Sequence, residues 1–187
     1  MAIDFLFRKQ AVRTLTPKTG VYLLCDLDNV PMYVGQSVDG IRSRVARHLT
    51  SARSDIIANR QIDVWEIAYV WTYPLDDRAE IGPLEAQLFH HFNSLSQLMN
   101  GSILPTSLGG DPPEPFQKIA IMSDSEIEDR RDPAKRLPRQ AAHYAQIVDH
   151  FLVVKNSTQI ARAMNAHFVR LQKYHSTLLG IAEELPE

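Results

Sequence analysis

The sequence contains a single cysteine, no long hydrophobic run and almost no net charge. Cys25 is the only cysteine among 187 residues, which excludes an intramolecular disulfide and a cysteine-based zinc site. A reducing compartment fits this composition best, so we expect a cytoplasmic protein. No segment approaches the roughly 18 apolar residues of a membrane helix, and charge interrupts the first apolar residues too early for a signal peptide. The net charge of -2 does not by itself indicate a nucleic-acid partner, so a DNA-binding surface requires local clustering of cations.

Composition and residue texture divide the chain into three expected parts. Residues 1–103 alternate between β-rich and helical patterns and predict a compact α/β domain. Residues 104–139 are rich in proline, glycine and alternating charge, which predicts a loop region or linker with a short strand at 118–122. Residues 140–187 have helical periodicity again, so we expect a mostly helical C-terminal extension.

The first half of the α/β part predicts a β-hairpin followed by a helix. Residues 19–25 and 31–36 are short β-rich runs separated by aspartate and asparagine residues, which favour a turn. Residues 41–49 have an apolar side chain at every fourth position, the pattern of an amphipathic helix, with Asp39 as its predicted N-cap.

The second half predicts a further strand and helix. Residues 62–73 are apolar or aromatic on both alternating faces, as expected of a strand covered on both sides. A second amphipathic helix is predicted to begin at Pro83 and to extend to Leu95. The expected fold is a three-stranded, mainly antiparallel sheet flanked by helices.

The hairpin carries two short motifs that set a tyrosine on each strand. The tripeptide GVY occupies positions 20–22, and YVG occupies positions 33–35. With the arginine-bearing helix and the glutamate-bearing helix that follow, this order resembles the GIY-YIG endonuclease family over roughly residues 15–103. The resemblance implies a divalent-metal-dependent endonuclease that hydrolyses DNA phosphodiester bonds, with Mg²⁺ or another divalent cation such as Mn²⁺ as its cofactor.

The resemblance also implies a set of catalytic residues and one metal ligand. Arg42 is the alternative to Arg44, and Asn93 is the alternative to Asn100. Glu85 is the implied metal ligand. The complete implied catalytic set is Tyr22, Tyr33, Arg44, His48, Glu85 and Asn100.

These residue types suit phosphodiester hydrolysis on chemical grounds. The reaction needs an activated water and positive charge at the phosphate. The Glu85 carboxylate can hold one Mg²⁺-type ion, Arg44 can direct two N–H donors at a phosphate, and His48 projects from the same helix flank. Tyr22 has an ordinary pKa of about 10, so it is a poor base unless a nearby cation favours its phenolate. The resemblance implies that it activates water, with Tyr33 or His48 assisting proton movement.

A DNA-binding face is predicted on the N-terminal part of the chain. Residues 1–60 contain nine lysine and arginine residues against five acidic ones, and cations contact the DNA backbone. Gly35 would let the substrate approach closely. The cations expected to contact phosphates are Lys18, Arg42, Arg47 and Arg53.

The C-terminal extension offers a second surface, because no acidic residue lies between Asp149 and Glu183. Residues 157–176 fit a DNA-binding helix-turn-helix with Ser157 or Thr158 as its N-cap. The same periodicity fits amphipathic helices that pack on the core or form a homodimer interface. Two other functions therefore stay open: a catalytically inactive nucleic-acid-binding module of the same fold, or an interaction protein that assembles through its helical tail.

Overall fold

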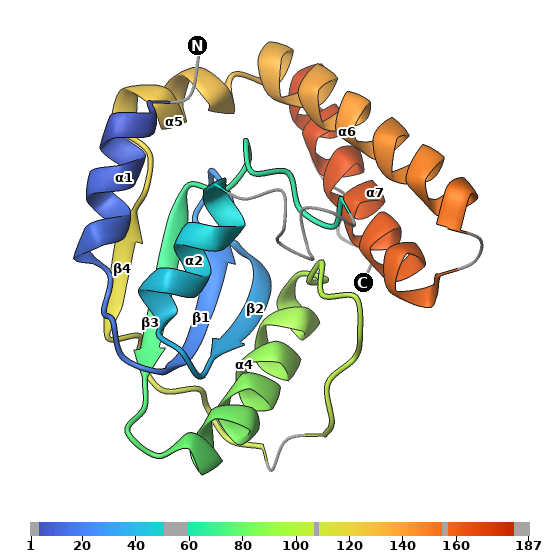
Figure 1. Ribbon diagram of the computed structural model, residues 1–187. Helices are drawn as coiled ribbons and strands as arrows, with labels where there is room; N and C mark the ends of the chain where they lie inside the picture. Colours follow the sequence, from blue (N-terminus) through green and yellow to red (C-terminus); the bar gives the residue numbers. More distant parts are fainter. Residues whose placement is uncertain (1–3, 51–59, 107–108, 155–156, 182–187) are drawn as a thin grey trace.

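The computed structural model of the protein describes residues 4–50, 60–106, 109–154 and 157–181. Its centre is a fully antiparallel sheet with the strand order β2-β1-β3-β4 (Figure 1). The strands are β1 (Gly20–Cys25), β2 (Pro31–Ser37), β3 (Tyr69–Pro74) and β4 (Gln117–Ala120). The predicted α/β class is confirmed. The sheet has four strands rather than three, because β4 pairs with β3 from a segment predicted to be mostly loop.

Helices cover both faces of this sheet and continue into a separate pair. They are α1 (Phe5–Thr14), α2 (Ile41–Thr50), α4 (Ile81–Leu95), α5 (Asp124–Arg131), α6 (Pro133–Val154) and α7 (Thr158–Leu179). Figure 1 shows α1 and α2 in front of the sheet and α4 beside β2. Tyr22 and Leu24 of β1 belong to the core cluster with α1 and α2, whereas Leu23 and Cys25 belong to the cluster with α4. Cys25 is therefore a core residue.

Two helices begin at positions other than those predicted. Helix α2 starts directly after Gly40, so Asp39 lies one position too early to be its N-cap. Helix α4 starts two residues before Pro83. The reason is a 3-10 turn, η1 (Arg78–Glu80), which leads into α4 and is capped by Asp77, whose Oδ1 accepts from the N–H of Ala79 at 2.8 Å.

The strand predicted at residues 62–73 begins only at Tyr69. The preceding residues form a turn: the Asp63 carboxylate accepts from the N–H of Trp65 at 3.1 Å, and the Asp63 carbonyl accepts from the N–H of Glu66 at 3.0 Å. Asp63 and Glu66 are buried. Aspartate side chains that bond to nearby backbone groups compete with a strand ladder, which explains why the apolar pattern of this segment was misleading.

The segment 104–139 is less of a linker than its composition suggests. Its described residues between 104 and 116 contain neither helix nor strand, whereas the remainder forms β4, α5 and the start of α6. The short strand is confirmed, but the loop prediction is wrong for the helices. Local capping explains them: the Ser123 hydroxyl accepts from the N–H of Glu126 at 3.3 Å, and Pro133 occupies the first position of α6, where its missing N–H costs nothing.

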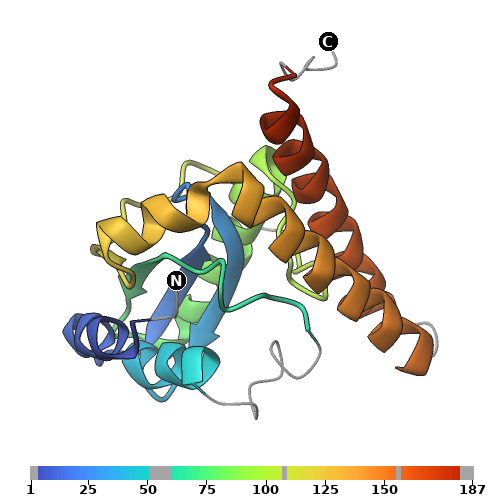
Figure 2. The same ribbon diagram turned by 90° about the horizontal axis from the view of Figure 1, so that it is seen from above.

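Helices α6 and α7 pack side by side and project past the sheet (Figure 2). Ser157 caps α7 as predicted, and Gly180 ends it in a left-handed conformation. Because α7 is one continuous helix of 22 residues, the helix-turn-helix predicted for residues 157–176 is wrong. The amphipathic alternative is confirmed in part, since Ile160 and Tyr174 of α7 are buried.

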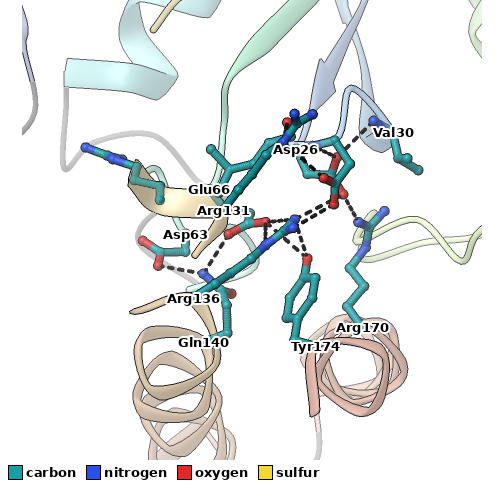
Figure 3. A network of polar contacts seen from close by, with 12 residues as sticks. Asp26, Val30, Asp63, Glu66, Arg131, Arg136, Gln140, Arg170 and Tyr174 are labelled. Carbon is teal, nitrogen blue, oxygen red and sulfur yellow. Dashed lines mark hydrogen bonds and ion pairs between the residues drawn. The ribbon is translucent and has the colours of Figure 1, made fainter. Parts of the chain in front are cut away.

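A buried ion-pair network attaches α6 and α7 to the turns at one end of the sheet (Figure 3). Arg136 of α6 is its centre. The Nε of Arg136 donates to Glu66 at 2.9 Å, its Nη1 donates to Asp28 at 2.6 Å, and its guanidinium lies 4.1 Å from the ring centroid of Tyr174. The Tyr174 hydroxyl also donates to Glu66, at 3.1 Å. Burial outweighs the effect of Arg136 and raises the pKa of Glu66 to about 7.

Two further arginines extend this network. Arg170 of α7 forms an ion pair with Asp26 and donates to the carbonyl of Pro31 at 2.9 Å. Arg139 of α6 contacts Asp63 through two N–H donors, each at 2.8 Å. The helical pair is thus joined to the hairpin turn and to the turn before β3 through ion pairs. The pairs Arg136–Glu66 and Arg170–Asp26 are buried, whereas the Arg139 side chain is 46% exposed.

No helix within the described residues is both long enough and apolar enough to cross a membrane.

Candidate active site

The two motif tyrosines meet on one face of the β1–β2 hairpin. Tyr22 lies directly opposite Gly35, and Tyr33 lies opposite Leu24, so both rings project from the same side of the sheet at a centroid distance of 6.4 Å. A Cβ atom on Gly35 would lie 2.4 Å from the Tyr22 hydroxyl oxygen. Gly35 therefore leaves the space that the Tyr22 ring needs to extend across edge strand β2.

Helix α2 brings a histidine and an arginine to this tyrosine pair. The Nε2 of His48 lies 2.6 Å from the Tyr22 hydroxyl oxygen, and the imidazole is almost fully buried. Its centroid is 5.8 Å from that of Tyr22 and 6.1 Å from that of Tyr33. Arg44, one helical turn earlier, is half-buried and hydrogen bonds to Tyr22. The structure thus brings together Tyr22, Tyr33, His48 and Arg44.

The surroundings of Tyr22 decide its protonation state. Burial raises its pKa well above the ordinary value of 10, Tyr33 raises it further, and Arg44 opposes this rise. The hydroxyl is therefore protonated at neutral pH in the free protein. His48 lies within hydrogen-bonding distance to accept that proton through Nε2.

Glu85 approaches the same edge of the sheet from α4. It lines a groove of about 960 Å³ between the start of α4 and a wall that includes residues 104–106, Gly109 and Pro113. Burial raises the pKa of its carboxyl to about 7. Glu85 makes no hydrogen bond or ion pair with any residue that the structure describes, so its carboxylate is available to a ligand.

Gln36, which the sequence analysis missed, connects the two halves of the site. It lines the groove that holds Glu85 and also a smaller pocket of about 310 Å³ that contains Arg44 and Arg47. The alternation of side chains along β2 could have identified Gln36. Tyr33 and Gly35 face α2, so the alternation of β2 turns Gln36 toward α4 and Glu85.

Asn100 supports the motif strand from outside the sheet. Its Oδ1 accepts from the Val34 N–H at 3.1 Å, and its Nδ2 donates to the Val34 carbonyl at 2.7 Å. The N–H of Met99 donates to the carbonyl of Met32 at 2.7 Å. Residues 99 and 100 therefore cover the edge of β2 as far as Val34, and the site lies where this cover ends.

Asn93, the alternative asparagine, has a different environment. Its Oδ1 accepts from the N–H of Leu98 at 3.1 Å and from Arg162 of α7. These contacts join the end of α4 to α7 rather than to the motif strand. Asn100 is thus the asparagine next to the tyrosine motif, and its amide is used to hold that strand.

The two candidate arginines on α2 also differ. Arg42, the alternative to Arg44, donates from its Nε to the carbonyl of Leu15 at 2.7 Å. This bond directs Arg42 toward the segment after α1. Arg44 is the arginine that contacts Tyr22.

The other predicted DNA contacts are spread over two surfaces. Arg47 is exposed in the pocket beside Arg44. Lys18 forms an exposed ion pair with Asp76 at 2.9 Å, which partly neutralises its charge. Arg53 lies outside the described residues. The pocket with Arg44 and Arg47 is therefore the stronger cationic surface next to the tyrosines.

A family model for the GIY-YIG catalytic domain matches residues 18–100. The chain contains a GIY-YIG domain. The matched range begins just before β1 and ends at Asn100, so it includes both tyrosines, α2 and α4. A GIY-YIG domain indicates nuclease-type function in general. Neither a curated protein nor a solved structure matches the chain.

The residues of this GIY-YIG domain fit a divalent cation held by one carboxylate. No three histidine, cysteine or acidic side chains come together as a metal cage within the described part of the chain. Mg²⁺ does not require such a cage, because it usually keeps several waters and binds one or two carboxylates together with substrate phosphate. Glu85, half-buried beside the groove and without a protein partner among the described residues, is such a carboxylate.

Proposed function

We propose that the protein is a divalent-metal-dependent endonuclease that hydrolyses DNA phosphodiester bonds at the outer edge of β2. The observation that carries this proposal is the convergence of Tyr22, His48 and Arg44 beside Gly35. Glu85, which has no ion-pair partner among the described residues, lines the groove beyond Gln36. The match of this segment to the GIY-YIG catalytic domain supports it.

The protein side chains divide the work according to their contacts. Arg44 binds the scissile phosphate and offsets the charge that develops on it, since a guanidinium directs paired donors at phosphate oxygens. The Tyr22 oxygen accepts a proton from the attacking water while its own proton passes to His48 Nε2, 2.6 Å away. Tyr33 packs against both rings and fixes their positions. Asn100 holds β2 in place through Val34 and acts as a positioning residue.

Glu85 is the proposed ligand for Mg²⁺ or Mn²⁺. When bound, such an ion supplies Lewis-acid stabilisation of charge on the phosphate and the departing oxygen. Glu85 must be ionised to hold the ion. Because burial raises its pKa to about 7, the free protein holds this carboxyl partly protonated at neutral pH, and cation binding favours the charged form.

The DNA backbone is proposed to enter along the pocket that contains Arg44 and Arg47. Both cations lie on α2 next to the tyrosine pair. Lys18 and Arg42 would contribute to backbone binding farther along the N-terminal surface. The buried, unpaired Cys25 fits a reducing compartment, which supports the cytoplasm as the place of action.

Cleavage of supercoiled plasmid DNA tests the proposed function. With Mg²⁺, we expect the native protein to cut, and we expect Glu85→Gln to cut at least about 100-fold more slowly, because loss of metal binding removes several kcal/mol of stabilisation. Glu80→Gln is the matched control, since Glu80 lines the same groove but is exposed at the start of α4. It should retain activity. Binding without cleavage by the native protein would favour an inactive DNA-binding module, and neither binding nor cleavage would favour an assembly protein.

We further propose a homodimer formed through α6 and α7. Large apolar side chains are exposed on both helices, including Leu152, Val153 and Phe168, and a helical pair with such residues can bury them against a second copy. Sedimentation equilibrium should show a particle of two chains, which Val153→Glu combined with Phe168→Glu should convert to one chain. A native protein that is monomeric at high concentration would contradict this part of the proposal.

A further inference from the structure

The groove beside Glu85 is chemically different from the pocket beside Arg44. Its apolar lining includes Leu75, Leu104 and Pro105, and its acidic residues are Glu80 and Glu85. Among the described residues that line it, none is a lysine or an arginine. A phosphodiester backbone is held by cations, so this groove is unsuited to it.

The pocket on the other side of Gln36 has the opposite character. Arg44 and Arg47 of α2 line it, and Asp39 is the one acidic residue among its described lining. Gln36 borders both spaces. A nucleotide bound at Gln36 would therefore meet cations on the side of α2 and apolar groups on the side of α4. These two environments complement the two halves of a nucleotide, its phosphate and its base.

The outer wall of the groove is fixed to α4. The Nε2 of His90 lies 3.0 Å from the carbonyl oxygen of Leu104 and 2.9 Å from that of Pro105. The Nε2 of Gln87 donates to the carbonyls of Gly110 and Asp111 at 3.3 and 3.1 Å. These bonds hold the wall open without a ligand. The groove is thus formed before substrate binds, as is usual for small-molecule sites.

We propose that this groove takes an unstacked nucleobase from the nucleotide next to the scissile phosphate. This inference rests on the proposed nuclease function and names its substrate class: DNA with an unpaired nucleotide at the cleavage point. The groove of about 960 Å³ lies within the range of about 300–1,000 Å³ typical of small-molecule sites and can admit a base. Apolar side chains such as Leu104 and Pro105 can stack against the flat faces of a base.

Unpaired substrates should be cut faster than paired ones. Removing a base from a paired duplex costs a few kcal/mol, and the cost is least where the base is already unpaired. We therefore expect cleavage at a single unpaired nucleotide to be at least about tenfold faster than in the matched paired duplex, since each 1.4 kcal/mol is a factor of ten. The cut should lie next to the unpaired nucleotide.

The test compares Leu104→Ala with Ile103→Ala on short duplexes. Leu104 lines the groove, whereas its neighbour Ile103 does not and is 70% exposed. A fluorescent adenine analogue, 2-aminopurine, replaces the unpaired base, and binding is measured separately by anisotropy in a chelator. The native protein and Ile103→Ala should change the 2-aminopurine emission on binding and should cut the duplex with the unpaired nucleotide faster than the paired duplex. Leu104→Ala should show neither the change in emission nor the faster cleavage of the unpaired duplex. It should still cut the paired duplex, which would show that this variant folds.

Equal cleavage of paired and unpaired duplexes, with no change in emission on binding, would overturn this inference and leave the nuclease function intact. An identical preference in Leu104→Ala and Ile103→Ala would also overturn it. A native protein that neither binds nor cuts any of these duplexes would overturn the nuclease function and this inference together.

Discussion

Replacing Arg136 by alanine is expected to lower the free energy of unfolding by about 3–5 kcal/mol, because it leaves the buried Glu66 carboxylate without its cation. Glu66 is almost fully buried, and its remaining donors are Gln140 and Tyr174. The substitution also removes the packing of the guanidinium on the Tyr174 ring. Urea unfolding followed by circular dichroism measures this loss.

Arg131→Ala is the control for this prediction. Arg131 forms an ion pair with Asp28 at 3.2 Å, but its side chain is 46% exposed, and exposed ion pairs contribute at most about 1 kcal/mol. A similar small loss for both variants would mean that the buried network does not stabilise the fold. A large loss for Arg136→Ala alone would show that the helical pair and the GIY-YIG domain depend on each other for stability.

Arg44→Ala is expected to reduce the rate of DNA cleavage by about 10²–10³-fold, the usual effect of removing a donor that stabilises charge in the transition state. The fold should be unaffected, because Arg44 is half-buried and forms no ion pair with the described residues, so no buried anion loses its partner. The measurement is the initial rate of plasmid nicking with Mg²⁺ at saturating protein.

Arg42→Ala provides the matched control, since it removes the same side chain two positions earlier on the same helix. Arg42 donates to the Leu15 carbonyl and does not contact Tyr22. We expect it to weaken DNA binding modestly and to leave the rate of the bound complex near that of the native protein. Equal losses of activity in the two variants would contradict the proposed contact of Arg44 with the scissile phosphate.

The hairpin and its tyrosines could be predicted from sequence because their geometry is local. Turn residues at 26–30 and short β-rich runs determine the pairing, and the pairing places Tyr22 opposite Gly35. The orientation of Gln36 toward Glu85 could have been predicted from the alternation of side chains along β2. Helix α2 follows directly, so its periodicity sufficed to bring Arg44 and His48 to one side.

Partners distant in sequence could not be predicted. Glu66 lies within the segment predicted as an apolar strand, and its partner Arg136 lies 70 positions away. The same holds for Asn100, whose bonds to Val34 bridge 66 positions. Charge in residues 104–139 suggested a linker because the sequence alone does not show which acidic and basic residues neutralise each other inside the fold. In α7, polar residues that the fold places at a buried interface were interpreted as a turn between two helices.

The proposed mechanism requires that Tyr22, which takes a proton from the attacking water, and Arg44, which binds the phosphate, act in one catalytic centre. A double-mutant cycle on the rate of Mg²⁺-dependent cleavage tests this most directly. Tyr22→Phe keeps the buried ring and removes only the hydroxyl that meets His48. Residues that act as one unit are strongly non-additive. We predict that Tyr22→Phe combined with Arg44→Ala cuts about as slowly as the slower single variant. Losses that multiply in the double variant would show two independent contributions and contradict a single centre.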